Sequence, residues 1–213
     1  NPPIRPGFWR GVNVNQNAVY LECFMDEMAA AAGRDPLEFR VAHLKNSPKS
    51  AAVLKAVAQK SGWGSGDGKS RGLALFHAFG SYVAACADVT VDGSGDLSIN
   101  RIVAATDCGT AVNPQQIEAQ IEGSFVYGLS AALYGEITYE NGQVQQDNFH
   151  TYPSMRIKDM PEVHSIVMPS GGFYGGVGEP TISVAAPAVL NAIFAATGTR
   201  IRTLPLKDQK LRA

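Results

Sequence analysis

The sequence has few cysteines and no paired metal-ligand motif. Its 213 residues include three cysteines, which lie far apart without a C-x-x-C pair. This pattern argues against a disulfide framework and against a cysteine-ligated zinc or iron–sulfur site. The four histidines stand singly, with no H-x-x-x-H pair, so they do not indicate a metal site either. We also find no apolar stretch that approaches the roughly 20 residues needed to span a bilayer.

Charge of either sign is also scarce. Charged residues make up 17% of the chain, and the formal net charge is −1. Because acids and bases are mixed along the sequence, no basic stripe indicates nucleic acid as a partner and no acidic tail is present. The hydrophobic share of 45% suits a globular chain with a substantial core. We therefore expect a small-molecule substrate and no nucleic acid.

The first 62 residues predict a helical part. Apolar residues recur at helical spacing over 17–32, and Gly33 is a suitable stop. Asp35 as N-cap and Pro36 at the first helical position predict a second helix, and a third is expected over 51–60.

The segment 61–71 carries four glycines among small polar residues, which is typical of a linker. We therefore place a domain boundary there, with a helical part at 1–62 and an α+β domain at 70–213.

Beyond residue 70 the apolar period changes to two. Alternation over 83–91, a turn at 92–96 and a return over 97–105 predict a hairpin. The stripe of apolar residues that follows predicts a long helix: Ile117, Ile121, Phe125, Leu129 and Leu133.

Later segments add further elements to this pattern. Asn141-Gly142 indicates a second hairpin, a short strand is expected at 163–168, a helix at 185–197 and a last strand at 200–204. The sequence thus favours an α+β fold with a mixed or antiparallel sheet and packed helices.

A glycine-rich segment precedes the last helix. Residues 171–180 read GGFYGGVGEP, with five glycines in eight residues. Glycine permits positive φ and lets backbone amides approach a ligand, and Glu179 is expected at the mouth of the helix. In isolation Glu179 fits equally well as an acid stabilised by the helix macrodipole. A nucleotide-binding interpretation is weak, because no lysine follows the glycines as in a P-loop.

The predicted long helix begins with a polar cluster. The sequence DCGTAVNP spans 107–114, and Gln120 lies in the first turns. Gln120 is either a solvated or capping amide or a donor to an oxo group or phosphate of a cofactor. Gly123 and Gly128 each cost about 1 kcal/mol in a helix, so we expect close packing there against a neighbouring backbone or a bulky ligand.

Four motifs occur in a fixed order: GFWRGVN, DCGTAVNP, AQIEGSFVYGL and GGVGEP. In this combination the chain resembles the molybdopterin-binding large subunit of the xanthine dehydrogenase/aldehyde oxidase family. It is most similar to isoquinoline 1-oxidoreductase-type β subunits of bacteria, and the resemblance runs from Phe8 to Pro205.

The resemblance implies roles for individual residues. Glu179 matches the general base that deprotonates water or hydroxide at molybdenum, and Gln120 matches a glutamine that contacts the pterin. Arg10 and Gly11 match a pair beside the molybdenum centre. The remaining cofactor-binding positions implied are Gly176, Val177 and Gly178. No side chain of the protein is expected to ligate the metal, which is held through the pterin.

Two further positions concern the substrate and the sheet. Val12 stands where xanthine dehydrogenases carry an aromatic residue that stacks on the substrate, which disfavours purines. Phe79-Gly80-Ser81 falls where the family has a strand near the cofactor, although a sheet-edge segment fits this tripeptide as well.

The resemblance also implies cofactors and partners. We expect molybdopterin, in its cytosine dinucleotide form, with molybdenum. Iron–sulfur clusters would lie on a partner subunit, with an electron acceptor such as a cytochrome. The family's Met-Gly-Gln-Gly segment is absent and the start Asn1–Trp9 reads as loop without an initiating Met. An N-terminal remainder of the same subunit is therefore an expected partner.

The expected function is oxidation of an aldehyde or hydroxylation of an N-heteroaromatic carbon with water as the oxygen source. The isolated chain is expected to be inactive. The alternative is a cofactor-free structural fragment that docks a missing N-terminal segment, for which a large exposed apolar face would be the sign. The sequence contains no targeting segment, so both a periplasmic and a cytoplasmic location fit it.

Overall fold

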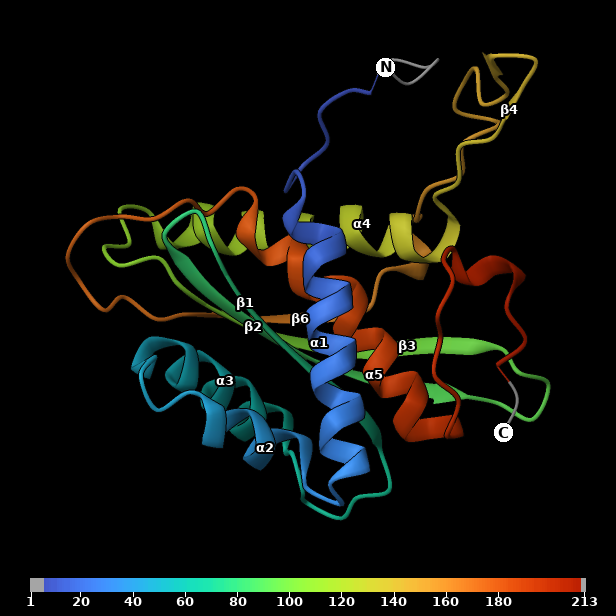
Figure 1. Ribbon diagram of the computed structural model, residues 1–213. Coiled ribbons are helices and arrows are strands. Elements are labelled where there is room, and N and C mark those ends of the chain that lie inside the picture. The colour runs from blue at the N-terminus through green and yellow to red at the C-terminus, as the bar shows by residue number, and fades with distance from the viewer. Residues whose placement is uncertain (1–5, 212–213) are drawn as a thin grey trace.

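The computed structural model describes residues 6–211 and centres on a four-stranded mixed sheet (Figure 1). The strands are β1 (Ser70–Ala78), β2 (Ser81–Val91), β3 (Leu97–Asp107) and β6 (Glu162–Val167), in the order β1-β2-β3-β6. The first three pair antiparallel, and β6 pairs parallel to β3. The predicted hairpin of β2 and β3 and the predicted α+β class are thus confirmed.

Helices cover both faces of the sheet. On one face α3 (Pro48–Ser61) packs against alternate residues of the strands, and on the other face α4 (Pro114–Tyr134) and α5 (Ala185–Thr197) do so. In β2, for example, Ala84 belongs to the first core and Ala85 to the second. Strands covered on both faces have near-continuous apolar runs, and residues 83–87 of β2 form such a run.

The N-terminal helices lie beside the sheet and α5. Figure 1 shows α1 (Val14–Ala31) lying with α5 over one side of the sheet. The helix α2 (Pro36–His43) begins as predicted: Asp35 Oδ1 accepts from the backbone N–H of Leu37 at 2.8 Å and of Glu38 at 2.9 Å. These bonds satisfy donors that the first turn of a helix leaves free.

Strand β1 is the main element that sequence reasoning missed. The predicted linker is a loop only to residue 69, and β1 follows directly. The tripeptide Phe79-Gly80-Ser81 is also not a strand as a whole, because Phe79 and Gly80 form the β1–β2 turn with φ of 52° and 76°. β1 escaped detection because most of its residues are buried, so its apolar residues do not alternate with polar ones.

The predicted last strand at 200–204 is wrong. Arg200 binds Asp26 and Arg202 binds Glu27, so this segment lies against α1 instead of on the sheet. The second predicted hairpin is present but short: β4 (Tyr139–Glu140) and β5 (Gln143–Val144) have two residues each. Of the predicted N-terminal loop, residues 1–5 lie outside the described part of the chain, and 6–9 have no regular structure.

The expectation that no apolar stretch approaches membrane-spanning length needs correction. The 3₁₀ turn η2 (Pro180–Val184) runs into α5, and these 18 residues are long and apolar enough to cross a membrane. They are 72% buried inside the protein, as expected for a core helix. The division of the chain into two domains stays a prediction, although α3 from the first part packs directly on the sheet of the second.

Candidate functional site

Arg10 joins three segments that are far apart in the sequence. Its Nε donates to the carbonyl oxygen of Gly178 at 2.5 Å. Its Nη2 lies 2.9 Å from the carbonyl oxygen of Gln120, 3.0 Å from Gln120 Oε1 and 2.8 Å from Ser124 Oγ. Burial lowers the pKa of Arg10, while Tyr127 and Glu179 act in the opposite direction. Because a guanidinium is the most basic side-chain group in proteins, Arg10 remains a cation at neutral pH.

Glu179 is held by the N-terminal segment and not by the helix that follows it. It occupies the N-cap position of η2, but its side chain makes no cap hydrogen bond. Instead, Oε1 accepts from the backbone N–H of Gly11 at 3.0 Å. A side chain at residue 11 would not fit, since a Cβ would lie 2.6 Å from Ile182 Cγ2. The pair Arg10-Gly11 thus reaches both Gly178 and Glu179.

Gln120 presents a donor with a defined orientation. Arginine has only donors, so its contact at 3.0 Å identifies the nearby Gln120 atom as the oxygen. The exposed side chain therefore keeps Nε2 as a donor for another group. A Cβ at Gly123 would lie 3.4 Å from Arg10 Nη1, which is an ordinary contact, so this arrangement does not require glycine at that position. The predicted close packing is found at Gly128 instead, where a Cβ would lie 2.5 Å from Ala185 Cβ.

The glycine-rich segment is tied to neighbouring loops before it reaches Glu179. The backbone N–H groups of Gly171, Gly175 and Gly176 donate to the carbonyls of Gly109, Cys108 and Phe79, at 3.1, 2.7 and 2.8 Å. Thr110 Oγ1 also donates to the carbonyl oxygen of Gly172 at 2.6 Å. The motif at 107–110 therefore serves to hold this segment, a role that sequence reasoning did not assign.

The last part of the segment offers free backbone donors. Within residues 6–211, the N–H groups of Val177, Gly178 and Glu179 have no hydrogen-bond partner. Gly176 is already bonded to Phe79, and the Val177 side chain packs against the core. These free amides flank Gly178, whose carbonyl binds Arg10, and neutral donors near a cation suit oxygen atoms of a phosphate or pterin.

The structure brings together nearly all of the predicted site. Arg10, Gly11, Gln120, Gly178 and Glu179 are connected by direct hydrogen bonds. Val12 follows in the same turn and is half exposed, and 176–177 lead into Gly178 along the chain. The roles assigned to these residues stay predictions.

Sequence reasoning missed three residues of this cluster. Ser124 lies four positions after Gln120, a spacing that places both on one face of a helix and could have identified it. Tyr127, over which the Arg10 guanidinium lies at 5.6 Å from the ring centre, is on the same face. Asn15 had no such signal.

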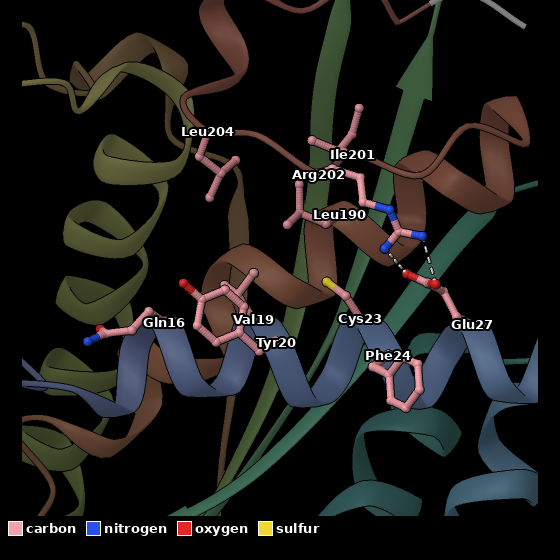
Figure 2. Close-up of a pocket in the computed structure, with 10 residues that line it drawn as sticks. All are labelled: Gln16, Val19, Tyr20, Cys23, Phe24, Glu27, Leu190, Ile201, Arg202 and Leu204. Carbon is pink, nitrogen blue, oxygen red and sulfur yellow. Dashed lines mark hydrogen bonds and ion pairs between the residues drawn. The ribbon is translucent and has the colours of Figure 1, made fainter.

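A separate hollow lies between α1 and the C-terminal segment. Figure 2 shows its lining residues, and its volume is about 450 Å³. The ion pair of Glu27 with Arg202 stands on one side of it, and burial raises the pKa of the Cys23 thiol to about 12. The hollow includes none of the residues bonded to Arg10 or Glu179, so it is distinct from the candidate site.

Comparison with known proteins identifies the family of this chain. Residues 10–161 match the family model of the molybdopterin cofactor-binding domain. The chain belongs to this family. Its relatives place it among the molybdopterin-binding domains of the xanthine dehydrogenase/aldehyde oxidoreductase group, which the motifs had indicated.

Two curated relatives and one solved structure illustrate the likeness. The chain is 34% identical to the β subunit of isoquinoline 1-oxidoreductase from Brevundimonas diminuta, over 94% of this chain and 26% of that one. It is 33% identical to a nicotinate dehydrogenase subunit of Pseudomonas putida, over 100% of this chain and 20% of that one. The aldehyde oxidoreductase of Desulfovibrio gigas has a TM-score of 0.69, covers 94% of this chain and 41% of that one, and at 16% identity shows a shared fold. The chain spans about a quarter of the length of the curated relatives.

Proposed function

We propose that this chain supplies the general base and one wall of the cofactor site of a molybdenum hydroxylase. The enzyme would oxidise an aldehyde or hydroxylate an N-heteroaromatic carbon with water as the oxygen source. The observation that carries the proposal is the junction of Gly11, Gln120 and Glu179 around Arg10. The names of the relatives, isoquinoline 1-oxidoreductase and nicotinate dehydrogenase, support an N-heteroaromatic substrate.

The side chains present fit the cofactor. Gln120 Nε2 and the free amides of Val177 and Gly178 would hold oxygen atoms of molybdopterin, and the charge of Arg10 would favour its phosphate. The molybdenum centre, when bound, accepts the two electrons that the substrate gives up.

The proton chemistry falls to Glu179. One carboxylate oxygen is engaged by Gly11, and within the described residues Oε2 has no partner. Oε2 can therefore take a proton from the attacking water while the Gly11 bond keeps the carboxylate in place. Half-burial limits the access of bulk water to this oxygen. Val12, with no aromatic ring, leaves space for substrates of another shape than purines.

Further parts of the enzyme belong to the same proposal. The cofactor would be the cytosine dinucleotide form, and electrons would leave through an iron–sulfur subunit to an acceptor such as a cytochrome. An N-terminal remainder of the same polypeptide would complete the cofactor site. The word "subunit" in the names of the relatives supports an assembly of several chains.

Glu179→Gln in the molybdenum-loaded enzyme tests the proposal. The amide cannot accept the proton, so kcat should fall by about 10²–10⁴-fold, while molybdenum content by elemental mass spectrometry stays unchanged. Glu118→Gln, on the exposed face of α4, is the matched control and should keep full activity. Near-normal turnover of Glu179→Gln would refute the role of Glu179 as base.

The alternative is a cofactor-free structural fragment, and one observation favours it. Tyr20, Leu21 and Phe24 on α1 are at least half exposed, which is unusual for a cluster of large apolar side chains. The molybdenum-to-protein ratio of the chain, purified with its native partners, distinguishes the enzyme from the cofactor-free fragment. A ratio near one supports the enzyme, whereas no molybdenum supports the fragment and an inactive isolated chain.

A further inference from the structure

We propose that Asn15 is a positioning residue for Glu179: it fixes the peptide plane between Arg10 and Gly11, and this plane aims the Gly11 N–H at the carboxylate. The catalytic consequence rests on the proposed function of Glu179. The positioning itself rests on geometry in the chain and can be tested without activity.

The Asn15 side chain binds both ends of the turn at 10–12. Its Nδ2 donates to the carbonyl oxygen of Arg10 at 2.8 Å and to that of Val12 at 3.1 Å. Two carbonyl oxygens require a donor, so the orientation of this amide is settled by its partners. Its Oδ1 is buried and has no hydrogen-bond partner. The side chain therefore serves as a donor only.

One peptide unit links Asn15 to Glu179. The carbonyl of Arg10 and the N–H of Gly11 belong to the same planar group and point in opposite directions. Asn15 holds the carbonyl end, and Glu179 Oε1 accepts from the N–H end at 3.0 Å. Rotation of this plane would break both bonds together. The carboxylate position is thus coupled to an amide that does not touch it.

The turn needs such a brace because its backbone is strained. Gly11 has a φ of 86° and Val12 a φ of 49°. Positive φ is rare for residues other than glycine and is an outlier for a β-branched one. Gly11 adopts its torsion without strain, so the strain lies at Val12, which together with the unpartnered Asn15 Oδ1 flanks the Gly11 bond to Glu179. Local strain of this kind persists where surrounding contacts enforce it, and it is concentrated at functional sites.

Asn15→Asp in the 213-residue chain tests the positioning. Aspartate has the same shape, but its carboxylate cannot donate to the two carbonyls, so the Arg10–Gly11 plane should rotate. We expect hydrogen exchange of the Gly11 amide, followed by NMR, to become about tenfold faster, as for the loss of one hydrogen bond. Asn17→Asp adds the same charge at an exposed position of α1 and should leave the Gly11 amide unchanged.

A second variant covers the case in which Asn15→Asp does not fold. Asn15→Ser adds no charge and keeps one hydroxyl donor, so it should give an intermediate exchange rate at the Gly11 amide. An unchanged Gly11 amide in a folded Asn15→Asp or Asn15→Ser chain would overturn the proposal.

Turnover in the molybdenum-loaded enzyme gives the catalytic readout. A misplaced base should lower kcat of Asn15→Asp by up to about 100-fold, with KM and molybdenum content nearly unchanged. Asn15→Ser should restore part of kcat. If Glu179→Gln keeps its activity, the proposed function fails, whereas the Gly11 amide result still decides the role of Asn15.

Discussion

Two arginines organise this chain in different ways. Arg40 is 1% exposed and binds the carboxylates of Glu22 at 2.9 Å and Asp26 at 3.4 Å. Arg10 is only partly buried and binds backbone carbonyls, an amide and a hydroxyl. The buried arginine is neutralised by its neighbours, whereas the other keeps a net charge beside free donors. A charge that is paired within the fold is not available to a ligand, whereas a charge bound only to neutral groups is available.

The location of the Arg40 cluster explains its structural role. β1 is an edge strand, and its outward backbone groups bind buried side chains: Leu75 N–H donates to Glu22, and Leu73 C=O accepts from Arg40 and Asn191. Covering the free groups of an edge strand prevents pairing with another chain. The side chains around Arg40 therefore cover the β1 edge of the sheet. Those around Arg10 instead join the N-terminal segment to α4 and to the glycine-rich segment.

The largest expected effect comes from Arg40→Ala. This change leaves Glu22 and Asp26 buried without one of their cations, so the free energy of unfolding should fall by about 3–5 kcal/mol. Urea denaturation measures the change, and Lys45→Ala at an exposed position is the control. A loss below about 1 kcal/mol would mean that Arg40 contributes little to the stability of the fold.

Arg10→Lys should have a smaller effect on stability and a larger one on the site. A single ammonium cannot reach Gly178 and Gln120 at once as the guanidinium does, and we expect a loss of about 1–2 kcal/mol. In the complete enzyme, molybdenum content should also fall. Urea denaturation and elemental analysis measure the two effects, with Arg34→Lys as the exposed control. Unchanged molybdenum with reduced stability would place Arg10 with Arg40 as a structural residue.

Glu27→Gln should have the smallest effect, and it depends on pH. The hydrogen bonds from Arg202 hold the pKa of Glu27 below its ordinary value. The stabilisation by this pair is therefore present above the unfolded-state pKa of about 4.3 and is lost as pH falls through the lower folded-state pKa. Denaturation midpoints from pH 7 to 3 should show parent and variant converging in acid. Glu140→Gln, at an exposed position, should show no such convergence. A difference between the two denaturation midpoints that stays constant at all pH values would show that the ionised Glu27 carboxylate is not the source of the stabilisation.

The sequence predicted those parts of the fold that depend on local signals. Asp35 and Pro36 indicated α2, and the turn at 92–96 indicated the β2–β3 hairpin. The parallel pairing of β6 with β3 joins segments more than 50 residues apart, and no local pattern specifies it. β1 was missed because burial on both faces removes the alternation that marks a strand.

The residues of the candidate site also differ in whether a local sequence signal predicts them. Glu179 and Gln120 came from ordered motifs, and the structure places them within one hydrogen-bonded group around Arg10. Ser124 could have been found from its i+4 spacing to Gln120, whereas Asn15 reaches Arg10 through a contact in the folded turn that no spacing along the chain indicates.

Helix α1 connects the two arginine clusters and sets a fixed distance between them. Gly11 just before the helix reaches Glu179, and Glu22 within it reaches Arg40. Each residue of an α-helix adds about 1.5 Å and 100° of rotation. A single insertion between these two positions would therefore turn one cluster away from its partners. The interval from 11 to 22 therefore cannot change in length without moving one of the two clusters.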